Sequence, residues 1–179
     1  IEDAACALGA THKGKYAGTF GDFGSFSLHP RKAISSGEGG LLLTNSELLK
    51  RKIEILRNHG IDFSTGEMDF VEAGFNYRLT DFQAALVNSQ LERLEKTLTY
   101  KQELAEVYFN EVKSNNITLP TIPEGSLHSW QTFHILLPNN YDRSKLIQEL
   151  KSKGIGTNYG AQCIPAQAYY YNIYKIDSA

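Results

Sequence analysis

The residue types that could do chemistry gather around one lysine. Lys32 follows a segment with serines at positions 25 and 27, and it precedes the glycine-rich turn 37–40. A lysine amine attacks carbonyl groups, and burial or a neighbouring cation makes it a better nucleophile. The ordinary alternative is a solvated lysine in an exposed loop. The motifs on either side of Lys32 favour the chemical interpretation.

The segments around Lys32 have the pattern of an α/β sheet. Residues 1–5 read as the end of a strand with Asp3 at its carboxyl end, where open α/β sheets bind their ligands. Residues 20–28 alternate aromatic and small side chains, which predicts a half-buried strand, and 41–43 form a short apolar strand. Between them, residues 8–19 are expected to be a glycine-bearing loop with a short hairpin.

Capping signals predict the helices. Asn45 or Ser46 begins a helix to about residue 58, and residues 61–75 are expected to be loop. Thr80 followed by Gln83 is a capping box that opens a long helical pattern to about residue 112, with a break expected near 97–99. Further on, the pattern predicts a strand at 130–137, a helix from Asp142 to about 153, and a strand at 155–159.

Composition excludes several classes of function. The 179 residues carry a formal net charge of −2 with no block of like charges, which indicates neither a nucleic-acid partner nor a membrane surface. No apolar run is long enough to span a bilayer. Cys6 and Cys163 make no disulfide framework and no metal-ligand pattern, so we expect no metal and a cytoplasmic location. The first residue is Ile1 and the single methionine is Met68, from which we expect a piece of a longer chain.

Four motifs occur in order along the first half of the chain. They are Glu2-Asp3-Ala4-Ala5, Ser27 to Lys32, Gly37 to Gly40, and Gly74 to Asp81. Together they resemble the DegT/DnrJ-type sugar-nucleotide aminotransferases, which depend on pyridoxal 5'-phosphate (PLP). The resemblance implies an α/β fold of the fold-type-I PLP-transferase class. Residues 1–95 would be the C-terminal part of a large domain with a mixed sheet and helices, and 96–179 a linking helix with a smaller C-terminal α/β domain.

The resemblance also implies roles for five residues. Lys32 matches the lysine that holds PLP as an internal aldimine and later moves the proton, and Asp3 matches the acid that keeps the pyridine nitrogen protonated. Ser27 matches a hydroxyl that binds the cofactor phosphate. Asn76 matches an asparagine that reaches the phosphate of a neighbouring subunit, which implies a homodimer with composite sites. Cys6 departs from the glutamine or histidine of many relatives near the cofactor ring, so its contact there is an open question.

Two further residues keep two interpretations each. His29 either fixes the loop that leads to Lys32 or contacts the substrate or the cofactor region. Arg78 either binds a carboxylate or phosphate of the substrate or forms a structural ion pair.

The expected activity is transfer of an amino group from L-glutamate to a nucleotide-linked keto sugar. One alternative is a sugar dehydratase of the same fold that uses pyridoxamine phosphate, although that class has histidine where this chain has Lys32. The other is a non-catalytic regulatory relative, against which the presence of Asp3, Ser27 and Lys32 argues.

Overall fold

The computed structural model describes residues 1–114 and 116–175 of the chain. These residues form two compact units. The first unit holds residues 1–112 and 121–133, and the second holds 113–120 and 134–179 as far as they are described. Among the described residues no helix is both long and apolar enough to cross a membrane.

A mixed three-stranded sheet carries the chemistry-bearing segments of the first unit. Its order is β1 (Glu2–Asp3), β4 (Gly24–Ser27) and β5 (Gly40–Leu43), with β1 parallel and β5 antiparallel to β4. Along β4, Gly24 and Phe26 are buried while the two serines between and after them are half-buried. This alternation confirms the predicted half-buried strand, although only its last part joins the sheet.

The hydrophobic core lies on both sides of the loop that bears Lys32. Leu28, just before this loop, is 1% exposed, and Ile34, just after it, is 2% exposed. Both pack with Val87 of α2 (Asp81–Leu91) in one cluster, with four partly buried leucines around it: Leu8, Leu41, Leu79 and Leu94. Because close-packed side chains allow little movement, the two ends of the Lys32 loop are held in place.

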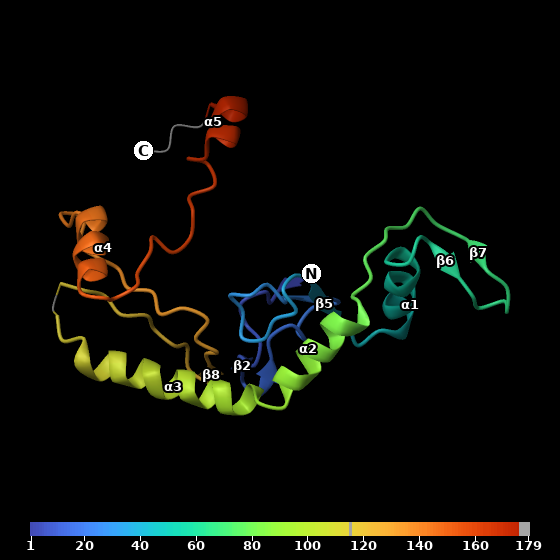
Figure 1. Ribbon diagram of the computed structural model, residues 1–179, viewed down its shortest axis with the longest axis horizontal. Helices are drawn as coiled ribbons and strands as arrows, with labels where there is room; N and C mark the ends of the chain where they lie inside the picture. The colour runs from blue at the N-terminus through green and yellow to red at the C-terminus, as the bar shows by residue number, and fades with distance from the viewer. Residues whose placement is uncertain (115, 176–179) are drawn as a thin grey trace. The chain divides into compact units, whose positions relative to one another are not determined.

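Small hairpins complete the sheets of this unit. The predicted hairpin in residues 8–19 is confirmed as β2 (Thr11–His12) and β3 (Lys15–Tyr16), and β8 (Ser126–Leu127) pairs with β2 from far along the chain. The segment 61–75, predicted to be all loop, instead contains a hairpin of β6 (Ile61–Asp62) and β7 (Asp69–Phe70). Figure 1 shows this hairpin beside α1 (Glu47–Leu56).

The predicted helix starts are confirmed at atomic level. The Ser46 hydroxyl accepts a hydrogen bond from the Leu49 backbone N–H at the start of α1. Thr80 and Gln83 form the full capping box at the start of α2. Each of these side chains satisfies a backbone group that the first helical turn would leave without a partner.

The break in the long helical pattern was predicted at the wrong place. Figure 1 shows α2 followed directly by α3 (Leu94–Glu111), and the interruption lies at Glu92 and Arg93. Inside α3, the hydroxyls of Thr97 and Thr99 donate to the carbonyls of Arg93 and Glu95, four residues earlier. Since both threonines are satisfied within the helix, they do not interrupt it.

The strand predicted at residues 130–137 is also wrong. Trp130 has a left-handed backbone with φ of 49°, which a strand cannot accommodate. Its indole N–H donates to the Gln102 Oε1 at 2.9 Å, and its ring packs against Phe109 and Phe133. These aromatic contacts with α3 decide the backbone here, and an alternating sequence pattern does not reveal them.

The second unit has fewer regular elements than its sequence pattern predicts. Asp142 caps α4 (Arg143–Ser152), as predicted, and α5 (Ala168–Tyr174) follows. The prediction of a strand at 155–159 is wrong, because none forms there among the described residues. Thr118 and Leu136 instead form an isolated antiparallel bridge.

Candidate active site

Lys32 points its amine at the thiol of Cys6. The Lys32 Nζ donates a hydrogen bond to the Cys6 Sγ at 2.8 Å, although the two residues are 26 positions apart. Lys32 is half-buried and Cys6 is exposed, so this contact lies at the surface of the first unit. Lys32 is therefore held by one polar partner instead of extending freely into water.

A small cavity collects several of the predicted site residues. It has a volume of about 10 Å³, roughly the space that one water molecule needs. Its lining comes from four separate segments of the chain and consists of Ala5, Cys6, Leu8, Ser27, Lys32, Ala33, Ser129 and Gln131. The structure thus brings together Lys32, Ser27 and Cys6, three of the residues to which the family resemblance gave roles.

A chain of local hydrogen bonds sets the turn between Ser27 and Lys32. The Ser27 hydroxyl oxygen accepts from the His29 backbone N–H at 3.3 Å, and the His29 Nδ1 accepts from the Arg31 N–H at 3.2 Å. The Lys32 N–H donates to the His29 carbonyl at 2.9 Å. His29 therefore shapes the turn that presents Lys32. The Ser27 hydroxyl hydrogen is not used in these contacts and can donate to another group.

Asp3 lies at the same edge of the sheet. In the parallel pairing of β1 with β4, Asp3 is opposite Ser25. The carboxyl ends of both strands therefore lie at one edge of the sheet, where Ser27 ends β4 and the loop with Lys32 begins. Ligands of open α/β sheets bind at such an edge. The Asp3 Oδ1 accepts a hydrogen bond from the Ala5 N–H at 3.1 Å, which leaves the exposed Oδ2 for another partner.

Two glutamines of α2 anchor the turn after Lys32, and the sequence motifs did not point to them. The Gln90 side chain accepts from the Ser35 N–H at 3.0 Å and donates to the Ser35 carbonyl at 2.7 Å. About two helical turns earlier, the Gln83 Nε2 donates to the Glu38 carbonyl at 2.9 Å. Both side chains bond backbone groups 45 or 55 residues away, a relation that no local pattern reveals.

Glu2 fixes the loop next to β1. Its carboxylate accepts hydrogen bonds from the Gly18 N–H at 2.6 Å and the Phe20 N–H at 3.0 Å. These two backbone donors lower the pKa of Glu2 below its ordinary value because they stabilise the charged form. Glu2 was not among the predicted site residues, and it acts here as a structural anion beside Asp3.

Ser129 and Gln131 line the cavity from a distant part of the chain. The Ser129 hydroxyl donates to the Cys6 carbonyl at 3.4 Å, and the Gln131 Nε2 donates to the Arg31 carbonyl. No sequence motif pointed to these residues, and Gln131 fell in a segment predicted to be a strand. Their contacts tie residues near position 130 to both sides of the Cys6–Lys32 pair.

Asn76 and Arg78 do not line this cavity. The Arg78 Nε donates to the Asn76 Oδ1 at 2.8 Å, and both residues are exposed. Asn76 is held in place by a backbone bridge to Asn58 beyond the end of α1. In this chain, therefore, the predicted phosphate ligand Asn76 is engaged in a different place from Ser27.

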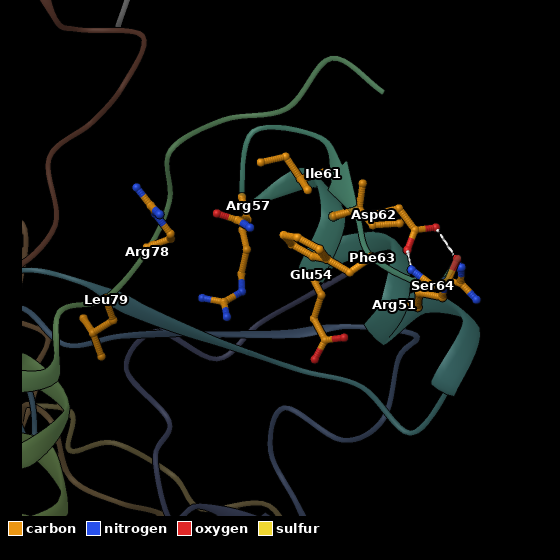
Figure 2. Close-up of a pocket in the computed structure, with 11 residues that line it drawn as sticks. Arg51, Glu54, Arg57, Ile61, Asp62, Phe63, Ser64, Arg78 and Leu79 are labelled. Atoms are coloured by element: carbon orange, nitrogen blue, oxygen red, sulfur yellow. Dashed lines mark hydrogen bonds and ion pairs between the residues drawn. The ribbon is translucent and has the colours of Figure 1, made fainter. Parts of the chain in front are cut away.

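Arg78 instead lines a larger groove of about 720 Å³ beside α1 and β6, which Figure 2 shows. Within it, the Arg51 guanidinium pairs with the Asp62 carboxylate at 2.7 Å and lowers the pKa of Asp62. The Ser64 hydroxyl donates to the same carboxylate at 3.0 Å. Although this groove is the larger of the two, it contains none of the predicted residues Asp3, Cys6, Ser27 and Lys32, and its lining holds no lysine, cysteine or histidine. Cys6, Ser27 and Lys32 therefore lie at the small cavity, whereas Asp3 lines neither of the two.

In the described part of the chain, no group of three or more histidine, cysteine, aspartate or glutamate side chains is arranged to hold a metal ion. The candidate site consists instead of an amine, a thiol, a hydroxyl and a carboxylate. This donor set is suited to a carbonyl compound that also carries acceptor groups.

Comparison with known proteins agrees with this chemistry. A model of the DegT/DnrJ/EryC1/StrS aminotransferase family matches residues 1–178, so the chain belongs to this family of PLP-dependent enzymes. The resemblance noted from the motifs is confirmed. The α/β fold-type-I class predicted from it is confirmed by the structural neighbours.

Three relatives illustrate the similarity. The chain is 39% identical to uncharacterized protein MJ1066 of Methanocaldococcus jannaschii, over 88% of this chain and 44% of that protein. It is 34% identical to UDP-4-amino-4,6-dideoxy-N-acetyl-beta-L-altrosamine transaminase of Campylobacter jejuni, over 98% of this chain and 46% of that protein. Among solved structures, one similar protein is the putative sugar aminotransferase Spr1654 from Streptococcus pneumoniae in its pyridoxamine phosphate (PMP) form. Its TM-score is 0.88 at 28% identity, and the match covers 96% of this chain and 46% of that protein.

The chain thus spans about half the length of the relatives it matches. The same Streptococcus protein has also been solved in a PLP form, with a TM-score of 0.87. The donor set described above fits PLP, since it offers an amine for the aldehyde, a hydroxyl for the phosphate and an acid for the ring nitrogen. The cavity itself has room for one water molecule only, so it does not enclose a group of the size of PLP.

Proposed function

We propose that the full-length protein is a PLP-dependent sugar aminotransferase and that Lys32 is its cofactor-binding lysine. The observation that carries this proposal is the position of the Lys32 amine. The amine lines the same cavity as Ser27. This cavity lies at the sheet edge where Asp3 is the last residue of β1. Membership of an aminotransferase family supports the same reaction type.

PLP, when bound, supplies an electron sink that stabilises negative charge on the α-carbon of an amino-acid substrate. The chain's own residues divide the remaining tasks. The Lys32 amine would hold the cofactor and, when free, would accept and return the proton of the substrate α-carbon. The Ser27 hydroxyl would donate to the phosphate, and the Asp3 carboxylate would be the acidic partner of the ring nitrogen.

The substrates of the proposal are L-glutamate as amino donor and a nucleotide-linked keto sugar as acceptor. The Campylobacter relative is named as a transaminase of a UDP-linked amino sugar, which supports a nucleotide sugar for this chain. In the proposal, Arg78 offers the remaining N–H groups of its guanidinium to a substrate anion, because only its Nε is occupied by Asn76. His29 contributes by holding the turn that presents Lys32.

The first half-reaction tests this function directly. We expect the purified full-length protein with PLP to show an absorbance band that L-glutamate bleaches, with release of one equivalent of 2-oxoglutarate per site. D-Glutamate is the matched control. It has the opposite configuration at the α-carbon, so its α-hydrogen projects to the other side and the band should not be bleached. A band that persists unchanged with every amino acid tested would contradict the aminotransferase and favour a non-catalytic relative.

A homodimer with shared sites is part of the proposal. Asn76 uses its side-chain oxygen for Arg78, so its amide N–H groups remain available to a phosphate outside this chain. On either side of it, Phe75 and Tyr77 stack at 4.9 Å and are 56% and 71% exposed. An exposed aromatic pair of this kind is a surface that a second copy of the protein would cover.

Mixing two inactive variants tests the shared site. Lys32→Ala and Asn76→Ala are each expected to be inactive or nearly so as homodimers, whereas subunit exchange between them should restore activity. A mixed dimer would carry one site with both residues intact, so at a one-to-one ratio about a quarter of the wild-type activity should return on purely statistical grounds. Mixing Lys32→Ala with Ser27→Ala is the control, since this chain places both residues in one site. Equal recovery in the two mixtures would rule out a site shared in this way.

We also place the protein in the cytoplasm. The support is that both Cys6 and Cys163 are free thiols, which a reducing compartment preserves. Nucleotide-linked sugars, the proposed substrates, are polar and charged and do not cross a bilayer unaided.

A further inference from the structure

We infer that Cys6 is a positioning residue for Lys32, with its sulfur holding the amine ready to capture the cofactor. This inference rests on the proposed function, because it assigns a role to the partner of the proposed cofactor lysine. The supporting contact is the hydrogen bond from the Lys32 Nζ to the Cys6 Sγ at 2.8 Å. Both side chains line the same small cavity.

The backbone of Cys6 is held by the turn that follows β1. The Asp3 carboxylate accepts from the Ala5 N–H at 3.1 Å, and the Ala7 N–H donates to the Ala4 carbonyl at 2.9 Å. The Ser129 hydroxyl donates to the carbonyl of Cys6. Because these contacts fix the backbone on both sides of Cys6, the sulfur is one rotatable bond from a fixed Cα, and its contact with the amine depends on χ1 alone.

The lysine side chain needs such a partner. Ordering a lysine costs up to about 2 kcal/mol of side-chain entropy, and a loop alone does not hold its amine in one position. Within the part of the chain that the structure describes, no carboxylate forms an ion pair with Lys32. The thiol is therefore the acceptor that orients this amine before the cofactor arrives.

Sulfur has an advantage over a carboxylate in this position. Thiol sulfur is a weak hydrogen-bond acceptor, whereas a carboxylate forms a strong, charge-assisted bond with an ammonium group. A weak acceptor orients the amine and still releases it when a carbonyl carbon approaches. Cys6 would thus increase the rate at which Lys32 captures the cofactor, because it orients the amine without strongly stabilising its unreacted state.

The rate of covalent capture tests this inference in the full-length protein. Apo-protein is mixed with PLP, samples are reduced with borohydride at intervals, and the fraction of Lys32 carrying the cofactor is read by peptide mass spectrometry. Cys6→Ala should capture PLP about 5- to 10-fold more slowly, which is the rate equivalent of one lost hydrogen bond. Cys6→Ser should recover much of this loss because its hydroxyl oxygen can accept from the same amine.

Cys163→Ala is the matched control, since Cys163 is an exposed thiol in the second unit. It should capture PLP at the wild-type rate. Thermal unfolding of each apo-variant separates loss of capture from loss of folding. If Cys6→Ala does not fold, alkylation of the folded wild-type protein at Cys6 with iodoacetamide is the second measurement and should slow capture at least as much.

The two proposals fail in different ways. If the wild-type protein captures PLP on Lys32 and Cys6→Ala does so equally fast, the positioning role of Cys6 is wrong and the proposed function stands. If the wild-type protein captures no PLP on Lys32, the proposed function itself is wrong. A Cys6→Ser variant as slow as Cys6→Ala would also overturn the inference, because the hydrogen-bond acceptor would then not be what matters.

Discussion

Replacing Lys32 with alanine should abolish transamination by the full-length protein, with a loss on the order of 10³-fold or more in turnover. The reason is that the proposed function gives both cofactor binding and proton transfer to the Lys32 amine. Turnover with L-glutamate and a nucleotide-linked keto sugar measures the loss. Borohydride reduction followed by peptide mapping should find no cofactor on the variant.

Two further variants separate chemistry from charge and from folding. Lys32→Arg keeps a cation near Cys6 but has no nucleophilic amine, so it should be as inactive as Lys32→Ala while unfolding at the wild-type temperature. Lys96→Ala removes an exposed lysine of α3 and should remain fully active. Cofactor trapped on a different lysine of the Lys32→Ala protein would show that the wrong amine has been assigned.

Gly24→Ala should destabilise the protein by about 3 kcal/mol, the upper range for an overpacked interior. Gly24 is the first residue of β4, and a Cβ atom placed on it would overlap the Gly18 carbonyl oxygen and Cα. Both are backbone atoms, which cannot rotate out of the way as a side chain can. Gly18 is in turn held by Glu2, so relief of the overlap would displace β4 relative to β1.

Urea denaturation of the full-length protein measures this effect. The matched control is Gly156→Ala, because a Cβ at Gly156 meets no atom within 4 Å and its backbone does not require glycine. That variant should unfold within about 0.5 kcal/mol of the wild type. A Gly24→Ala protein of unchanged stability would mean that β4 and the Gly18 loop are less tightly packed than the structure shows.

How much of the site was predictable from sequence depends on distance along the chain. The grouping of Ser27 with Lys32 follows from a local turn, whose hydrogen bonds join residues two or three positions apart. Asp3 could be placed at the same sheet edge because strand ends carry ligands in α/β folds. The contact between Cys6 and Lys32 could not be predicted in this way, since it depends on how the turn after β1 packs against a loop 26 residues later.

Two predictions of secondary structure were wrong, one because of a tertiary contact and one because of hydrogen bonds inside a helix. The sequence pattern from residue 130 predicted a strand, but Trp130 has a left-handed backbone and packs against Phe109 and Phe133. The threonines at 97 and 99 looked like a helix break, yet their hydroxyls are satisfied inside α3. In each case the deciding partner was a group that the local pattern did not take into account.

The sequence by itself determined the family and the helix caps, and it pointed to Lys32 as the candidate site lysine. These features depend on residue types at short spacing, where backbone geometry leaves few choices. Only the tertiary structure decided which side chain accepts the hydrogen bond of the Lys32 amine. It also decided that Gln83 and Gln90 of α2 hold the turn that follows Lys32. Such contacts join segments far apart in sequence, and they exist only once burial of Leu28, Ile34 and Val87 has brought those segments together.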